Sequence, residues 1–86
     1  MSDYSLAVAL NAMFRFLQVP VDAGGPASHE DYQAVWQAMY SARSQLFRES
    51  SVRAKSQKVD HPWAEGLTLS YVDDATMERL KRESRG

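Results

Sequence analysis

The chain has 86 residues, of which 44% are hydrophobic and 24% charged, with a formal net charge of −1 and no cysteine. This length predicts one small domain with a modest core. The lack of cysteine excludes disulfides, cysteine-ligated zinc and a thiol nucleophile, and it favours a reducing cytoplasm. We expect no membrane span, because no apolar run approaches ~20 residues. We also expect no signal peptide, because Ser2 and Asp3 follow Met1 in place of a basic region and an apolar core. Arginine outnumbers lysine seven to three and isoleucine is absent, a bias typical of GC-rich bacterial or viral genomes, phages and mobile elements included.

Residues 3–18 predict the first helix, which has one apolar face made of Leu6, Leu10, Met13, Phe14 and Leu17. Pro20 ends this pattern, because the residue before a proline is pushed out of the helical region. Residues 19–27 hold two prolines and a Gly-Gly pair, which predicts a linker between two helices that fold back on each other.

Residues 28–49 predict the second helix. Ser28 followed by Asp31 resembles a capping box, and Glu30 and Asp31 suit the positive end of the helix dipole. The apolar residues that follow at helical spacing form a wide and aromatic stripe: Tyr32, Val35, Trp36, Met39, Tyr40, Leu46 and Phe47.

Residues 51–72 predict a basic and β-forming segment. Leu67 to Val72 alternates as a strand does, with Leu67, Leu69 and Tyr71 on one face. Its partner is either residues 51–59, which would make a hairpin, or the same strand of a second subunit. Residues 74–85 predict a C-terminal helix capped by Asp73 or Asp74. The predicted fold is therefore mainly α: a helix–loop–helix pair, a short β segment or hairpin, and a C-terminal helix in a single small domain.

Charge is segregated along the chain. Residues 1–42 sum to −3, residues 43–58 to +4, residues 59–78 to −5 and residues 79–86 to +3. Such blocks either face one another in the fold or, for the basic ones, form a patch for phosphates. The linker of residues 19–27 is too long for an ordinary helix-turn-helix, which has about 3–4 residues in its turn.

Catalytic and metal-binding residues are not apparent, and no cofactor motif is present. His29 lies at a helix start beside two acids that favour capping, and His61 lies in a His-Pro-Trp turn, so we expect both to be structural. The serines lack the Gly-x-Ser-x-Gly context of a nucleophile elbow. We therefore expect no enzyme, no catalytic residue and no metal ligand.

The aromatic stripe is the feature with the most information about function. One interpretation is that it is all core, because aromatic residues dominate the burial of a helix face. The other is that one edge of it forms an intermolecular surface, because Tyr, Trp, Met and Arg are enriched in the cores of interfaces. The residues predicted to bind a protein are Tyr32, Trp36, Tyr40, Arg43, Phe47, Arg48 and Trp63.

The sequence thus favours a small cytoplasmic adaptor, regulator or inhibitor that binds another protein through an aromatic helix face. We expect a homodimer as well, because the core is small and the strand lacks an obvious partner. The alternative is a nucleic-acid-binding regulator that uses residues 43–58 and the C-terminal helix. Its predicted contact residues are Arg43, Arg48, Arg53, Lys55 and Lys58.

Overall fold

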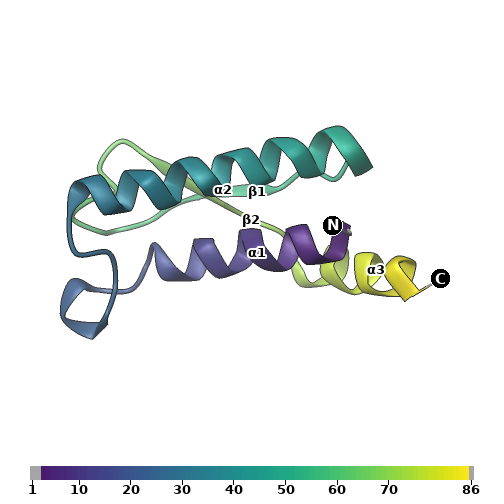
Figure 1. Cartoon of the computed structure of the whole chain (residues 1–86), viewed down its shortest axis with the longest axis horizontal. Helices are drawn as coiled ribbons and strands as arrows, with labels where there is room; N and C mark the ends of the chain where they lie inside the picture. Colours follow the sequence, from purple (N-terminus) through teal and green to yellow (C-terminus); the bar gives the residue numbers. More distant parts are fainter. Residues whose placement is uncertain (1–2, 86) are drawn as a thin grey trace.

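A computed structural model describes residues 3–85 as three α-helices and one β-hairpin (Figure 1). Helix α1 spans Asp3–Phe16 and α2 spans His29–Ser50, and a short 3-10 turn, η1, lies between them at Val21–Ala23. Strands β1 (Lys55–Lys58) and β2 (Thr68–Tyr71) follow, and α3 spans Asp74–Arg85. The predicted mainly helical fold with a hairpin and a C-terminal helix is confirmed.

Helices α1 and α2 lie side by side and antiparallel, with the linker at one end of the pair (Figure 1). The Ser28 hydroxyl caps α2 by accepting the backbone N–H of Asp31 at 3.1 Å, as the sequence indicates. Helix α1 ends at Phe16, two residues before the predicted end. The reason is that the N–H groups of Gln18 and Val19 bond to carbonyls three residues back, which tightens the chain into a turn ahead of Pro20.

The linker depends on its two glycines. Gly24 has φ 93°, a left-handed conformation that ends η1. A side chain on Gly25 would overlap the Val19 carbonyl, so the close return of the chain requires glycine there. The linker can therefore reverse direction tightly enough to place the start of α2 beside the end of α1.

The core lies where one face of each long helix meets the hairpin. Helix α1 contributes Leu6 and Leu10, and the turn after it contributes Leu17. Helix α2 contributes Tyr32, Met39 and Leu46, spaced seven residues apart. Tyr32 is fully buried, which corrects its prediction as a protein-binding residue. Its ring lies 5.0 Å from that of His61, and burial raises the pKa of its hydroxyl above 10.0.

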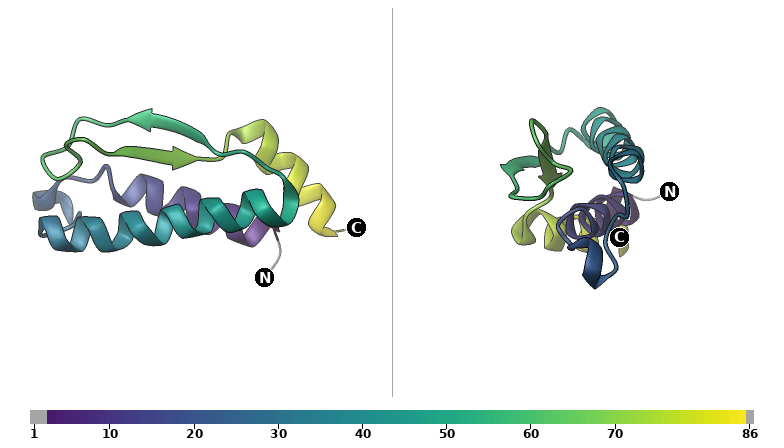
Figure 2. Two further views of the ribbon diagram at one scale, coloured as in Figure 1. Left: turned by 90° about the horizontal axis from the view of Figure 1, so that it is seen from above. Right: turned by 90° about the vertical axis from the view of Figure 1, so that its left-hand side faces the viewer.

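Strands β1 and β2 pair antiparallel within the chain, with Lys55 opposite Tyr71 and Lys58 opposite Thr68. The partner left open by the sequence is therefore the preceding segment of the same chain. The hairpin lies on one side of the helix pair, with β2 nearer the helices and β1 outside it (Figure 2). Leu69 and Ser70 of β2 are buried, whereas all of β1 is exposed.

The end of β2 is bound to α1 through Asn11. Its side-chain amide donates to the Val72 carbonyl at 2.9 Å, and its carbonyl accepts the Val72 N–H at 2.7 Å. The Phe14 ring packs 4.9 Å from the Tyr71 ring beside it. One polar residue of α1 thus continues the hydrogen bonding of the hairpin.

His61 connects the linker to the hairpin loop. Its Nδ1 accepts the Trp63 N–H at 3.2 Å, and its Nε2 lies 3.2 Å from the Val19 carbonyl. A neutral ring with its proton on Nε2 satisfies both bonds. Only 8% of His61 is exposed, and it has the structural position that its turn sequence favours.

Helix α3 begins after Asp73, whose carboxylate accepts the Thr76 N–H at 3.3 Å. Hydrogen bonding to Thr76 is the main reason that the pKa of Asp73 lies below 3.8; desolvation opposes it, and the nearby Lys55 adds a smaller lowering. Leu80 of α3 is buried where α3 packs against the first part of α1 (Figure 1). This end of the molecule lies far from the linker (Figure 1).

Candidate functional site

The predicted aromatic stripe of α2 divides into two edges, because successive residues of a helix are turned by ~100°. Val35 lies on the edge toward α1, where it shares a groove with Met13 and Phe16. Trp36, Tyr40, Arg43 and Phe47 recur every three or four residues on the other edge, and Trp36 bonds to Thr68 of the hairpin. Four of the predicted protein-binding residues are therefore brought together on one face; they are Trp36, Tyr40, Arg43 and Phe47.

The side chains on this face contact one another in sequence order. The Trp36 and Tyr40 rings stack with centroids 5.5 Å apart and planes at 29°. The Arg43 guanidinium carbon lies 5.4 Å from the centroid of Tyr40, and that of Arg53 lies 5.0 Å from the centroid of Phe47. At these distances the ring quadrupole attracts a cation, by about 0.5–1 kcal/mol at exposed sites. The rings therefore hold both guanidinium groups in place.

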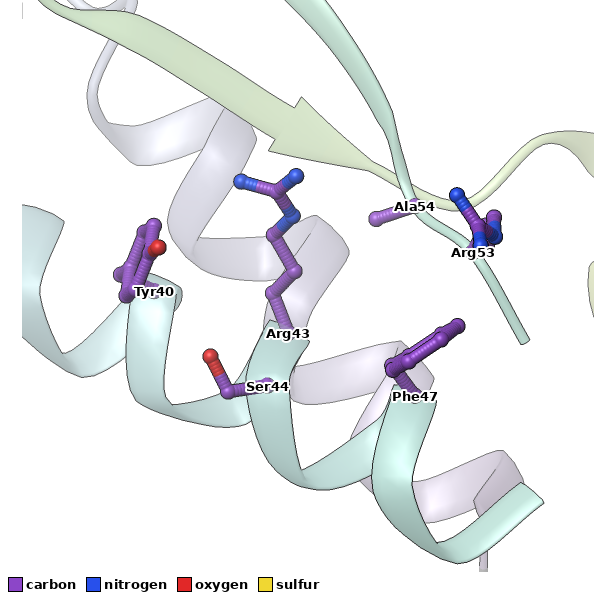
Figure 3. Close-up of a pocket in the computed structure, with 6 residues that line it drawn as sticks. All are labelled: Tyr40, Arg43, Ser44, Phe47, Arg53 and Ala54. Atoms are coloured by element: carbon purple, nitrogen blue, oxygen red, sulfur yellow. The ribbon is translucent and has the colours of Figure 1, made fainter. Parts of the chain in front are cut away.

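A groove lies between α2 and the chain that leaves it, as Figure 3 shows. We call it the arginine groove. It has a volume of about 260 Å³ and is lined by Tyr40, Arg43, Ser44, Phe47, Arg53 and Ala54.

The chain that follows α2 forms the second wall of the arginine groove. Ser51 has φ 59°, and its N–H bonds to the Phe47 carbonyl at 2.8 Å. This left-handed residue turns the chain back along the helix, which places Arg53 over Phe47. A continued helix would have carried Arg53 away from that ring, so the groove depends on where α2 ends.

Trp36 connects this face to the hairpin by a hydrogen bond. Its indole N–H donates to the Thr68 carbonyl at 2.9 Å, and its side chain is half-buried. Tyr40 and Phe47 remain 48% and 45% exposed. Trp36 therefore supports the site from beneath, whereas Tyr40 and Phe47 are available to a partner.

Neither arginine of the groove forms an ion pair with any carboxylate of residues 3–85. The ion pairs found there are Lys55–Asp73 at 3.7 Å and Arg79–Glu83 at 3.9 Å. A guanidinium that contacts only an aromatic face keeps its N–H donors for a carboxylate or phosphate. The arginine groove therefore combines apolar surface with two unneutralised cations.

The remaining predicted protein-binding residues lie elsewhere. Arg48 is exposed on α2 but does not line the groove. Trp63 lies in the hairpin loop, with its ring 6.3 Å from that of His29 at the start of α2. Its indole nitrogen is buried and has no hydrogen-bond partner among the described residues. Trp63 thus lies at the opposite end of α2 from the groove.

The residues predicted for nucleic-acid binding are only partly gathered. Arg43 and Arg53 share the groove, and Lys55 and Lys58 follow on β1. Lys55 is paired with Asp73, and Arg79 of the basic C-terminal helix is paired with Glu83. One residue of the positive block 43–58, Lys55, is therefore neutralised by an acid that the fold brings to it.

Sequence reasoning missed Ser44 and Ala54 as groove residues and did not place Arg53 among the protein-binding ones. Small residues at these two positions leave the space that Figure 3 shows between the helix and the returning chain. No local pattern marks them, because the contact depends on the turn at Ser51. The closest signal is the pair Ser50-Ser51, which interrupts the helical pattern.

Residues 3–85 contain no group of three or more His, Asp or Glu side chains placed to hold a metal ion. None of the helices described is long and apolar enough to cross a membrane. No protein-family model matches the chain, and searches of curated proteins and of solved structures also give no match.

Proposed function

We propose that this chain is a non-catalytic protein-binding module, a small adaptor, regulator or inhibitor that acts by occlusion or assembly. The observation that carries the proposal is the arginine groove. It presents two aromatic rings that are nearly half exposed, at 48% and 45%, beside two arginines without ion pairs within residues 3–85.

Tyrosine and arginine are the residue types that most often dominate the energy of protein interfaces. Here they are also preorganised, because the Tyr40 ring holds Arg43 and the Phe47 ring holds Arg53. Holding these side chains before binding reduces the entropy that a partner would otherwise have to remove. The groove therefore favours a partner segment that carries both an apolar side chain and a carboxylate.

A nucleic-acid-binding regulator remains the second candidate. It is supported by the same cation–ring contacts, since bases stack on aromatic rings and phosphates attract arginine. The net charge of −1 and the pairing of Lys55 with Asp73 weaken it. Phosphate contacts would make the affinity fall steeply with salt, which separates the two candidates.

A pull-down with matched variants tests the proposal. Tagged wild type, Tyr40→Ala and Val8→Ala are incubated with lysate of the cells that carry the chain, with and without nuclease. Val8 is the control, because it is 39% exposed on α1 and lies outside the groove. We expect one stoichiometric protein that survives nuclease, is kept by Val8→Ala and is lost by Tyr40→Ala. A central tyrosine contributes about 2 kcal/mol or more, roughly thirtyfold in affinity.

Equal melting of the three proteins is required, because it separates a lost contact from a lost fold. Recovery that is identical for Tyr40→Ala and wild type would contradict the proposed site. Recovery that collapses with nuclease and moderate salt would favour the nucleic-acid candidate instead.

The expected homodimer and cytoplasmic location also remain proposals. An unpaired strand no longer supports a homodimer, because β2 pairs with β1 of its own chain. What supports it is an apolar groove on the face of α1 and α2 away from the hairpin, lined by Ala12, Met13, Phe16, Ala34, Val35 and Ala38. Light scattering on wild type and Phe16→Ala tests it, and a monomer at all concentrations would contradict it.

A further inference from the structure

Strand β1 is an edge strand, and one of its two sides has no partner strand among residues 3–85. All four of its residues are exposed, and it belongs to a sheet of two strands. Figure 2 shows β1 outside β2 relative to the helix pair. In an antiparallel ladder, every second residue directs both its N–H and its carbonyl away from the paired strand. Half of the residues of β1 therefore present backbone groups that no strand of residues 3–85 satisfies.

The charge along this edge is positive. Strand β1 begins and ends with lysine and contains no acid, and Arg53 lies two positions before it. Lys55 is paired with Asp73, whereas Lys58 has no ion-pair partner in the described part of the chain. A segment that runs antiparallel along β1 would therefore pass Lys58 first and Arg53 last.

The edge of β1 is continuous with the arginine groove. Arg53 and Ala54 line the groove and lead directly into Lys55. At ~3.3 Å per extended residue, the distance from Lys55 back to Arg53 is only about 7 Å. A single extended segment that pairs with β1 would thus need only about two further residues to reach Arg53 at the groove.

We propose that the partner supplies an acidic extended segment that adds to β1 as a third strand and inserts an apolar or aromatic side chain into the arginine groove. This inference rests on the proposed protein-binding function and names the chemistry of the partner. Backbone hydrogen bonds to β1 supply affinity that is independent of sequence. Carboxylates facing Lys58, Arg53 and Arg43 supply the selectivity.

Charge complementarity favours this occupant over a second copy. If two β1 strands paired antiparallel over their full length, Lys55 of each would face Lys58 of the other, and like charges directly opposite destabilise a sheet. A nucleic acid meets the arginines but has no strand of amide groups to pair with the edge. Only an acidic polypeptide matches both the charge and the backbone.

The test uses short fluorescent peptides as probes, with binding measured by fluorescence anisotropy. Arg53 and Lys58 are five positions apart, so along an extended chain their side chains lie on opposite faces. The first probe therefore carries Glu on both of its faces, with Val elsewhere and one central Phe. The second replaces each Glu by Lys, the third has every backbone nitrogen methylated, and the fourth is a single-stranded oligo-dT. We expect the acidic peptide to bind best, the methylated peptide to lose most of that affinity and the basic peptide not to bind.

Protein variants locate the binding. Lys58→Glu should weaken the acidic peptide about five- to tenfold, because an exposed attraction becomes a repulsion. Arg82→Glu makes the same charge change on α3 and should have no effect.

Two proline substitutions test whether the peptide pairs with the free edge of β1. Ser56→Pro and Gln57→Pro each remove one N–H of β1, and because neighbours alternate, one of them faces β2 and the other faces outward. The variant that melts like wild type should lose the peptide. Retained binding by that variant would overturn the proposal.

The outcomes separate this inference from the function it rests on. Equal affinity for the methylated and unmodified acidic peptides would overturn strand addition. Tighter binding of the oligonucleotide than of the acidic peptide would overturn it in favour of nucleic acid. If no peptide binds while the lysate partner still depends on Tyr40, the protein-binding function stands and the acidic-strand inference is wrong.

Discussion

Replacing Asn11 by alanine should destabilise this protein more than any other single change of a polar residue that we consider here. Asn11 exchanges two hydrogen bonds, of 2.9 and 2.7 Å, with the backbone of a residue 61 positions away. Val72 is only 3% exposed, so water cannot easily replace the lost amide. Leaving a buried polar group unsatisfied costs about 1–3 kcal/mol. Because two groups lose their partner, we expect a loss of about 2–4 kcal/mol in the free energy of unfolding.

Such a loss is large for a chain of 86 residues, since stability is about 0.05–0.15 kcal/mol per residue. At ~4–8 °C per kcal/mol for a domain of this size, the melting temperature should fall by roughly 8–30 °C. Circular dichroism measures this fall, and hydrogen exchange of the Val72 amide measures the local effect. That amide should exchange much faster, because its acceptor is gone.

Two controls test the reasoning behind this number. Gln18→Ala removes one side-chain bond, to the Phe14 carbonyl at 3.0 Å, within the end of α1, and should cost only about 0.5–1.5 kcal/mol. Asn11→Asp keeps the acceptor but places a carboxylate oxygen against the Val72 carbonyl. The loss in free energy of unfolding caused by Asn11→Asp should shrink as the pH approaches ~4, where protonation of the carboxylate restores a hydrogen-bond donor. If Asn11→Ala melts within about 2 °C of wild type with unchanged exchange at Val72, the reasoning is refuted.

Three further changes test other parts of the structure. Tyr32→Phe should raise the melting temperature by about 4–8 °C, because it removes a buried hydroxyl that has no partner in residues 3–85. Burial raises the pKa of Tyr32, so above pH 10.0 the unfolded chain loses the hydroxyl proton before the folded protein does, and wild type should become less stable. Thermal melts from neutral to alkaline pH should show a smaller loss of stability for Tyr32→Phe. Asp73→Asn keeps a capping oxygen for Thr76 and should melt like wild type at neutral pH. As the pH falls below 3.8, wild type should lose the stability that the lowered pKa of Asp73 provides, and an equal acid sensitivity of both proteins would contradict that assignment. Trp36→Phe should cost about 1 kcal/mol in chemical denaturation, because the bond to Thr68 is lost while a ring remains; no change would show that this bond contributes nothing.

The helices could be predicted because their signals are local. The spacing of Leu6, Leu10 and Leu17 predicts α1, and Ser28 predicts the start of α2, where its hydroxyl does accept the Asp31 N–H. The strand pattern around Leu69 also predicts β2, although the identity of its partner had to be left open. Propensity, capping and periodicity all operate within a few residues, and so a single sequence displays them.

The candidate site could be predicted only in part. Tyr32 and Tyr40 belong to the same stripe, yet one is fully buried and the other 48% exposed. Periodicity tells which way a side chain points from its helix axis, but burial also needs an element that covers it. The hairpin loop covers Tyr32 at His61, whereas nothing in residues 3–85 covers Tyr40 to the same extent.

By itself, the sequence determined the three helices, the strand pattern around Leu69, and the aromatic stripe of α2 with arginines at its edge. Only the tertiary structure decided that Arg43 and Arg53 share a groove, that Tyr32 is core, and that Asn11 continues the hydrogen bonding of β2. These outcomes depend on contacts between residues far apart in the chain or across a turn. Their energies appear only once the turn at Ser51 and the close return at Gly25 have brought the segments together.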